Sequence, residues 1–474
     1  MRIVFSGVLL LLASCYIDRG DSATGLFLSL LSYDLSEKFD DFGRCVANTA
    51  TAGDVETFQK ISDTGGSFDG VLNNGDNFGH AMAALDLDGD CRMELAVGAH
   101  YDDDGGGWDK GAIWILFLNA DGTVRSHQKI SDTEGGFTAG LNNGDQFGHA
   151  LGTADINNDG IPELLVGAKD DGDMLYYCSY YCDYGALYVL FLNPDGTVNS
   201  HRKITSMQNG FDVTLDMGDE FGLGPTGIGD LDGDGVTELV TGSLIDYDGP
   251  DRGGLWILFM NTDGTVKSQR VIFSSIFGGF DGILMDYDRF GSFNAGLGDF
   301  DGDGVPDLAT AAYNDSDDGN TNAGAIWTLF LNPDGTVKTD RKISSFIGNS
   351  GMQIDAGDQF GHGLIAPGDL NGDGIMDLVT GAPFDEDAGA GAGAAWPVFL
   401  GRDGIPAGHG KISDGVTGNF HARLEDNDNF GSSIAYPGDL NGDGIHDLFV
   451  SARGDDDGGT DRGAVYVLFL QAAQ

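Results

Sequence analysis

Short apolar runs separated by turns rich in glycine, aspartate and asparagine recur along most of the chain, always in the same order. In one copy, QFGHALGTAD (146–155) enters an acidic loop, ELLVGA (163–168) leaves it, GALYVLFLN (185–193) follows a variable loop, and TVNSHRKIT (197–205) returns across the turn NPDG. Apolar runs of about four to eight residues between such turns predict β-strands, and Asp-Gly between two strands favours a hairpin. Each repeat therefore holds four short strands, which is typical of a propeller blade.

The third strand of each repeat is apolar on both faces, as in Ala112–Leu118 (AIWILFL) and Ala186–Leu192 (ALYVLFL). Such strands need cover on both sides, which stacked blades provide. One position of this strand is always aromatic: Trp114, Tyr188, Trp256, Trp327, Trp396 and Tyr466. Because repeat packing places equivalent residues at equivalent points, we expect these aromatics in the core between blades, with a ligand-stacking ring as the alternative.

The two ends of the repeat region predict how the ring closes. The last repeat begins at Phe430 and stops after its third strand, whereas Val55–Ser62 (VETFQKIS) matches the fourth strands and has no complete repeat before it. Pairing these ends leaves no open blade. The sequence therefore predicts an all-β, six-bladed propeller over residues 55–474, closed by an N-terminal strand. Residues 39–54 contain a further Phe-Gly pair without an acidic loop. This segment is interpreted as a strap over the ring, and a degenerate seventh blade is the alternative.

Between the first and second strands of every repeat lies an acidic loop such as DLDGDGVTE (230–238), with oxygen-bearing side chains at its first, third, fifth and ninth positions. The loops start at 86, 155, 230, 299, 369 and 439, a regular recurrence that rules out chance. The predicted metal ligands are Asp86, Asp88, Asp90 and Glu94; Asp155, Asn157, Asp159 and Glu163; Asp230, Asp232, Asp234 and Glu238; Asp299, Asp301, Asp303 and Asp307; Asp369, Asn371, Asp373 and Asp377; and Asp439, Asn441, Asp443 and Asp447.

This spacing indicates calcium. Side chains at positions one, three and five of a tight loop can converge, and a glycine at position six permits the turn that brings a later carboxylate behind them. Calcium takes six to eight hard oxygen ligands at roughly 2.3 to 2.6 Å. The loop differs from an EF-hand because its closing acid comes at position nine and leads into a strand. Cys91 replaces the glycine of the first loop, where a left-handed residue costs roughly 1 to 2 kcal/mol, so this site is predicted to be the weakest.

Each acidic loop follows a Phe-Gly pair, at residues 78, 147, 221, 290, 360 and 430, and turns such as Val166-Gly167-Ala168 come after it. Over residues 55–474 the chain thereby resembles FG-GAP repeat proteins, whose best-known members form the N-terminal propeller of integrin α chains. The resemblance implies calcium in the loops and a ring face used for adhesion or ligand binding. Integrin propellers have seven blades, and integrin α chains continue into leg domains and a membrane helix. We therefore expect no integrin β chain as partner.

Composition narrows the partners further. The chain has 474 residues, 41% of them apolar, and a net charge of −51. This apolar content predicts a folded core, and the charge disfavours nucleic acid and anionic lipid surfaces. Adaptation to a saline medium and plain solubility both stay open as reasons for the acidity.

The N-terminus, MRIVFSGVLLLLASC (1–15), predicts an export signal, because its apolar run is too short to span a bilayer and ends in small residues. Leu12 to Cys15 also resembles a bacterial lipobox, which favours a lipid anchor at Cys15 over an ordinary cleaved signal; residues 16–54 would be the tether and strap. Cys178 and Cys182 are expected to pair, which leaves Cys45 with Cys91, and free thiols are the alternative. The predicted location is secreted or cell-surface.

Three classes of function fit these features. The favoured one is a calcium-binding extracellular module that binds an unknown protein or glycan ligand, and the others are a propeller enzyme acting on glycans or lipids and a purely structural surface protein. The sequence holds no GxSxG, HExxH or phosphate loop, so we predict no enzyme. His80, His149 and His362 each follow an FG pair, which suggests packing rather than catalysis.

Other acids have two interpretations. The loops at 101–109, 245–251 and 452–461 would form extra cation sites or a solvated acidic rim. An aspartate also stands two residues before every FG, where it is expected to brace a turn rather than bind ligand. These aspartates are Asp76, Asp145, Asp219, Asp288, Asp358 and Asp428.

Overall fold

The computed structural model describes residues 52–103, 106–172, 183–244, 250–273, 277–316, 319–345 and 351–472. The chain divides into two compact units, Met1–Val46 and Ala47–Gln474, and every described residue belongs to the second. The predicted signal, Cys15, Cys45, Cys178 and Cys182 lie outside the described residues. Where the structure describes the chain, no helix is long and apolar enough to cross a membrane.

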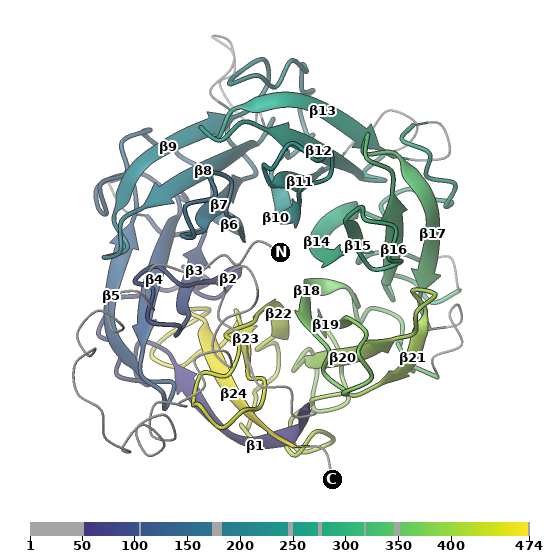
Figure 1. The fold of residues 1–474 in the computed structure, drawn as a ribbon. Coiled ribbons are helices and arrows are strands. Elements are labelled where there is room, and N and C mark those ends of the chain that lie inside the picture. The colour runs from purple at the N-terminus through teal and green to yellow at the C-terminus, as the bar shows by residue number, and fades with distance from the viewer. Residues whose placement is uncertain are drawn as a thin grey trace, which may run out of the picture. The chain divides into compact units, whose positions relative to one another are not determined.

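The second unit is a ring of six four-stranded antiparallel sheets, with one sheet for each predicted repeat (Figure 1). The first strand of each sheet lies nearest the ring axis and the fourth at the rim. The strands are β2 (Met82–Leu85), β3 (Glu94–Ala99), β4 (Ala112–Leu118) and β5 (Val124–Ile130) in blade one; β6 (Phe147–Ala154), β7 (Glu163–Ala168), β8 (Ala186–Leu192) and β9 (Val198–Ile204) in blade two; β10 (Leu223–Gly229), β11 (Glu238–Ser243), β12 (Gly254–Met260) and β13 (Val266–Ile272) in blade three; β14 (Phe290–Gly298), β15 (Asp307–Ala312), β16 (Ala325–Leu331) and β17 (Val337–Ile343) in blade four; β18 (His362–Gly368), β19 (Asp377–Ala382), β20 (Ala394–Leu400) and β21 (Pro406–His409) in blade five; and β22 (Phe430–Ala435), β23 (Leu448–Ala452), β24 (Ala464–Ala472) and β1 (Ala52–Ile61) in blade six.

The ring closes as the sequence predicts. β1 pairs antiparallel with β24, with Phe58 opposite Leu468 and Ile61 opposite Val465. The sixth sheet therefore has the order β1-β24-β23-β22, with one strand from near the N-terminus and three from the C-terminus. This confirms the prediction of six blades closed by an N-terminal strand, and the described residues hold no seventh blade.

An aromatic cluster between neighbouring blades forms the repeating unit of the core. In blade two, the FG phenylalanine Phe147 stacks on Phe137 with ring centroids 4.7 Å apart, and Tyr188 meets Phe147 edge to face at 5.5 Å. Fully burying one such side chain contributes roughly 1.5 to 3 kcal/mol. All six aromatics of the third strands are buried, which confirms their predicted place in the core.

The glycines of the FG and GA motifs let adjacent blades touch through their backbones. A Cβ added to Gly98 on β3 would lie 2.1 Å from the carbonyl oxygen of Gly148 on β6, and one added to Gly167 would lie 2.2 Å from that of Gly222. No side chain fits at such distances. The two motifs therefore mark the two sides of the same contact between blades.

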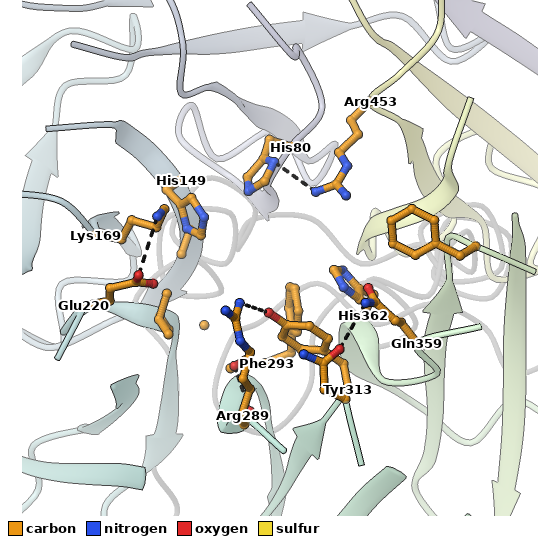
Figure 2. A pocket seen from close by; sticks show the side chains of 16 residues that line it. His80, His149, Lys169, Glu220, Arg289, Phe293, Tyr313, Gln359, His362 and Arg453 are labelled. Atoms are coloured by element: carbon orange, nitrogen blue, oxygen red, sulfur yellow. Dashed lines mark hydrogen bonds and ion pairs between the residues drawn. The ribbon is translucent and has the colours of Figure 1, made fainter. Parts of the chain in front are cut away.

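The course of the strands places two kinds of loop on opposite faces of the ring. In every blade the first strand runs from the FG pair to the acidic loop, and the second strand runs back. All six acidic loops therefore share one face. The residues beside FG and those that follow the second strand gather at the other face, close to the axis (Figures 1 and 2).

Candidate functional site

The six acidic loops have the same internal hydrogen bonds. In the third loop, the Gly235 N–H donates to Asp230 Oδ2 at 2.8 Å, and the Asp234 N–H donates to Asp232 Oδ1 at 3.1 Å. The Leu231 N–H donates to Oε2 of the closing acid Glu238 at 2.6 Å. The equivalent three bonds occur in each of the other loops. These bonds hold the side chains at positions one, three, five and nine in fixed directions.

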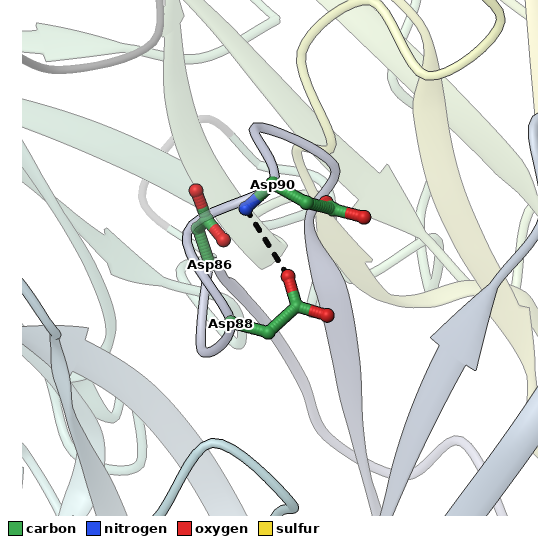
Figure 3. A group of neighbouring side chains, drawn as sticks. All are labelled: Asp86, Asp88 and Asp90. Carbon is green, nitrogen blue, oxygen red and sulfur yellow. Dashed lines mark hydrogen bonds between the residues drawn. The ribbon is translucent and has the colours of Figure 1, made fainter.

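Three loops bring three carboxylates to one point. Asp86, Asp88 and Asp90 each place an oxygen within 4.8 Å of the others, as Figure 3 shows. The same holds for the triplets that start at Asp230 and at Asp299. In the remaining loops the third position is Asn157, Asn371 or Asn441, so two acids and an amide oxygen are available there.

The backbone of each loop needs two left-handed residues, at positions four and six. Position six has φ between 79° and 88° at its five glycines, and Cys91 adopts φ 63° in the first loop. Position four is glycine in five loops and Asn158, with φ 58°, in the second. The predicted strain at Cys91 is therefore present. Cys91 is disulfide-bonded, and since the other four cysteines lie outside the described residues, its pairing with Cys45 stays a prediction.

Burial raises the pKa of every closing acid. The pKa reaches about 7 for Glu94, Glu163, Glu238 and Asp447 and about 6 for Asp307 and Asp377, because these carboxyls have left water; the other acids of each loop add to the rise. Glu238 Oε1 and Asp155 Oδ1 are buried and have no hydrogen-bond partner in the described structure. Such oxygens fit a divalent cation, since calcium would supply the missing partner and the opposing charge.

Basic residues on three fourth strands contact the loops of their own blades. Lys267 Nζ lies 2.8 Å from Asp232 and 2.6 Å from Asp234, and Lys338 lies 2.6 Å from Asp301 and 2.5 Å from Asp303. Arg125 lies 3.4 Å from Asp88. These are the three loops with aspartate at position three. In the third and fourth loops the added lysine offsets the added aspartate, and the first loop has Arg92, 3.7 Å from Asp90, in addition to Arg125.

The aspartates that precede FG brace turns, as predicted. Asp76 Oδ2 accepts the N–H of Asn73 at 2.6 Å, and Asp288 Oδ2 accepts that of Met285 at 2.6 Å. The other four accept the N–H three residues earlier in the same way. All six are buried.

The aspartate three residues after the second strand forms an ion pair with a lysine in five blades. Asp102 pairs with Lys129 at 2.8 Å, and Lys129 also lies 5.1 Å from the ring centroid of Trp114. The same pairing joins Asp171 to Lys203, Asp315 to Lys342, Asp385 to Lys411, and Asp455 to Lys60. In the third blade the lysine position, opposite Trp256, is Val271. These acids therefore belong to buried ion pairs, which the sequence interpretation missed although lysine recurs before Ile in five fourth strands.

A polar pocket of about 500 Å³ lies at the axis, on the face opposite the acidic loops (Figure 2). Three positions of each repeat supply most of its lining: the residue before FG, the residue after FG, and the residue after the second strand. Its charged residues are Lys169, Glu220, Arg289 and Arg453, and His80, His149, His362, Phe293, Tyr313 and Gln359 complete most of the wall.

The predicted packing histidines lie in this wall. The His80 ring centroid is 3.8 Å from that of His100 and 4.5 Å from that of His149, and His362 packs 4.6 Å from Tyr313. Burial lowers the pKa of all four histidines, to about 3 for His362, so each is neutral at pH 7. His80, His100 and His149 pack together, and His80, His149 and His362 line the pocket. The sequence did not predict this pocket, because residues of different repeats meet there.

FG-GAP repeats are detected in this six-bladed propeller. The FG-GAP repeat model matches residues 147–190, 290–329, 364–396 and 430–468, which lie in blades two, four, five and six. Integrin alpha-PS2 of Drosophila melanogaster is 30% identical over 252 residues, 51% of this chain and 16% of that protein. Integrin alpha-3 of Cricetulus griseus is 25% identical over 206 residues, 43% of this chain and 17% of that protein.

The relatives also include a protein named as an enzyme. Phosphatidylinositol-glycan-specific phospholipase D of Bos taurus is 30% identical over 195 residues, which are 40% of this chain and 21% of the relative. In each of these comparisons the chain spans less than a quarter of the relative's length. The similarity therefore concerns the propeller repeats and leaves the activities of the whole relatives open.

Proposed function

We propose that this chain is a calcium-binding extracellular propeller that acts as an adhesion or ligand-binding module at a cell surface. The observation that carries the calcium part is the repetition of one hydrogen-bonded acidic loop in all six blades. The similarity to integrin α chains supports the binding part, because those relatives are named as integrins.

Calcium would stabilise each blade. The ligands would be the side chains at positions one, three, five and nine, and the ion would offset the repulsion among them. Because the loop joins the first and second strands, a bound ion would hold the innermost strand on its neighbour. A metal that binds only the folded state stabilises that state by mass action.

We propose binding rather than catalysis, although one group of relatives bears the name of a phospholipase D. The sequence offers no nucleophile elbow, metalloprotease motif or phosphate loop. An assay for release of glycan-linked phosphatidylinositol headgroups tests the alternative. Turnover that persists in the purified chain and disappears in a pocket variant such as Tyr313→Phe would overturn the proposal of a non-enzymatic module.

We also propose that the chain is exported and anchored through Cys15, and that it works without an integrin β chain. The predicted signal over residues 1–15 supports export. Fatty-acid labelling of the full chain and of Cys15→Ala is the measurement. Label on the wild type and none on the variant supports the anchor, whereas equal label on both contradicts it.

The calcium part is tested by calorimetric titration of metal-stripped residues 16–474. We expect about six equivalents, and five would identify the strained loop of Cys91 as the weak site. An absence of binding at millimolar calcium, the weak end of known affinities, contradicts the proposal. Retention of protein or glycan ligands on the immobilised chain, in calcium and in chelator, tests the binding part separately.

A further inference from the structure

The axial pocket carries the opposite charge to the rest of the molecule. Among its lining residues, Lys169, Arg289 and Arg453 are cationic and only Glu220 is a carboxylate. The whole chain has a net charge of −51. Paired charges would stabilise the fold equally well. A local excess of positive charge in so acidic a chain therefore indicates a function other than folding.

Arg453 has no carboxylate partner among the residues that the structure describes. The residue follows β23, is half-buried at the axis, and its Nη1 lies 3.5 Å from Nδ1 of His80. That imidazole is neutral because burial lowers its pKa, so it offsets none of the charge. Burial also lowers the pKa of Arg453 itself, which shows that its surroundings do not stabilise the cation.

Arg289 reaches the same pocket from blade four (Figure 2). It donates from Nη1 to Tyr313 Oη at 2.6 Å, and its Nη2 lies 3.8 Å from Asp251. Its Nε is buried and has no hydrogen-bond partner in the described part of the chain. Lys169, by contrast, is compensated by Asp170 at 3.0 Å and Glu220 at 3.8 Å. Among the described residues, Arg453 thus has no acid opposite its charge, and one buried donor of Arg289, its Nε, has no acceptor.

The backbone holds one of these side chains in an unusual conformation. Arg289 stands directly before FG and adopts a left-handed φ of 59°, as do Glu220 and Gln359 at the equivalent positions. All six residues before FG share this left-handed conformation, and three of them, Glu220, Arg289 and Gln359, line the pocket. Phe293, Tyr313 and His362 form a wall beside them, with ring centroids 4.6 to 6.0 Å apart.

We propose that the axial pocket binds a small organic acid through its carboxylate, with the charge held by Arg453 and Arg289 and the body of the ligand against Phe293, Tyr313 and His362. Guanidinium groups bind carboxylates through paired charge-assisted hydrogen bonds. The pocket volume of about 500 Å³ suits a ligand of monosaccharide to disaccharide size, such as a uronic acid. This inference rests on the proposed function, because it names a class of ligand for the proposed binding module.

The test is calorimetric titration of the full chain in calcium with D-glucuronate, D-glucose and inorganic phosphate. We expect saturable binding of glucuronate at millimolar concentration or below and none of glucose. Arg453→Gln should weaken glucuronate binding about tenfold or more, since it removes a charge-assisted pair. Arg402→Gln is the matched control, because it removes the same charge from an exposed turn, and its affinity should equal that of the wild type.

Three results would overturn the inference: no glucuronate binding by the wild type, equal binding by Arg453→Gln, or tighter binding of phosphate than of glucuronate. The last would assign the pocket to inorganic anions instead of organic acids. Arg289→Gln provides a second variant if Arg453→Gln does not fold. A calcium titration of each sample separates this outcome from failure of the metal proposal, since the loops lie on the opposite face of the ring.

Discussion

Single residues decide how closely the blades approach one another, and Gly167 shows this most directly. Its added Cβ would lie 2.2 Å from the carbonyl oxygen of Gly222 in the next blade, which cannot move without shifting a strand. We expect Gly167→Ala to lower the free energy of unfolding by about 3 kcal/mol, the upper end of overpacking costs. Chemical denaturation in calcium measures the change.

Gly65→Ala is the control for this substitution. A Cβ at Gly65 would meet its nearest atoms at 3.5 Å, which is ordinary contact, and the residue has no left-handed φ. Its free energy of unfolding should change by less than about 1 kcal/mol. Equal effects of the two variants would show that the contact between glycines does not limit the blade spacing.

At the scale of the blade, the fourth strands carry basic side chains that are buried or half-buried. Lys129 is buried between Asp102 and the ring of Trp114, and Val271 shows that a blade can form without this lysine. We expect Lys129→Val to destabilise the chain by about 3 to 5 kcal/mol, because Asp102 would stay buried without its partner. The double variant with Asp102→Asn should recover a large part of this loss in thermal denaturation. No recovery would mean that packing on Trp114, and not charge, accounts for the lysine.

The same strand also sets the charge of the metal loop. Lys267 on β13 lies within 2.8 Å of Asp232 and Asp234, so it competes with a bound cation. We expect Lys267→Gln to tighten calcium binding at this loop by about fivefold at low salt, because one positive charge that repels the ion is removed. Arg270→Gln, on the same strand but facing Asp334, should leave calcium binding unchanged. Weaker binding in Lys267→Gln would instead show that the lysine orders the loop.

At the scale of the whole molecule, the sequence analysis predicted the features that recur in every repeat and missed the features that form only when the ring closes. The six blades, the pairing of β1 with β24 and the buried aromatics follow from patterns that recur about every 70 residues. The axial pocket does not recur from blade to blade, because the residue before FG varies from Glu220 to Arg289 and histidine follows FG in three repeats alone. Arg289 and Arg453 are 164 positions apart in the chain, and only the closed ring brings them to one pocket. The lysine that recurs in the fourth strands could be recognised in the sequence, but the aspartate with which it forms an ion pair was identified only in the structure.

The whole-molecule property that the acidic loops should govern is the dependence of stability on pH. The closing acids have folded-state pKa values of about 6 to 7, above those of an unfolded chain, because of burial and of the neighbouring acids. A raised folded-state pKa contributes stability below the unfolded value, and this contribution is lost as pH rises through the folded value. In chelator, the thermal midpoint should therefore fall between about pH 5 and pH 7.5. The repulsion within a chain of net charge −51 acts in the same direction.

Calcium should reverse this trend, since metal ligands must be deprotonated and the ion gains affinity as the carboxyls lose their protons. With calcium in excess, the midpoint should rise over the same pH range, so the curves with and without metal diverge toward neutral pH. Magnesium is the matched control: it demands a smaller octahedral site and keeps its waters, so it should separate the curves much less. Parallel curves in calcium and chelator would mean that the loops do not hold the ion in the folded ring. The energetic cost of burying these carboxyls would then be offset by the rest of the fold, without a bound ion.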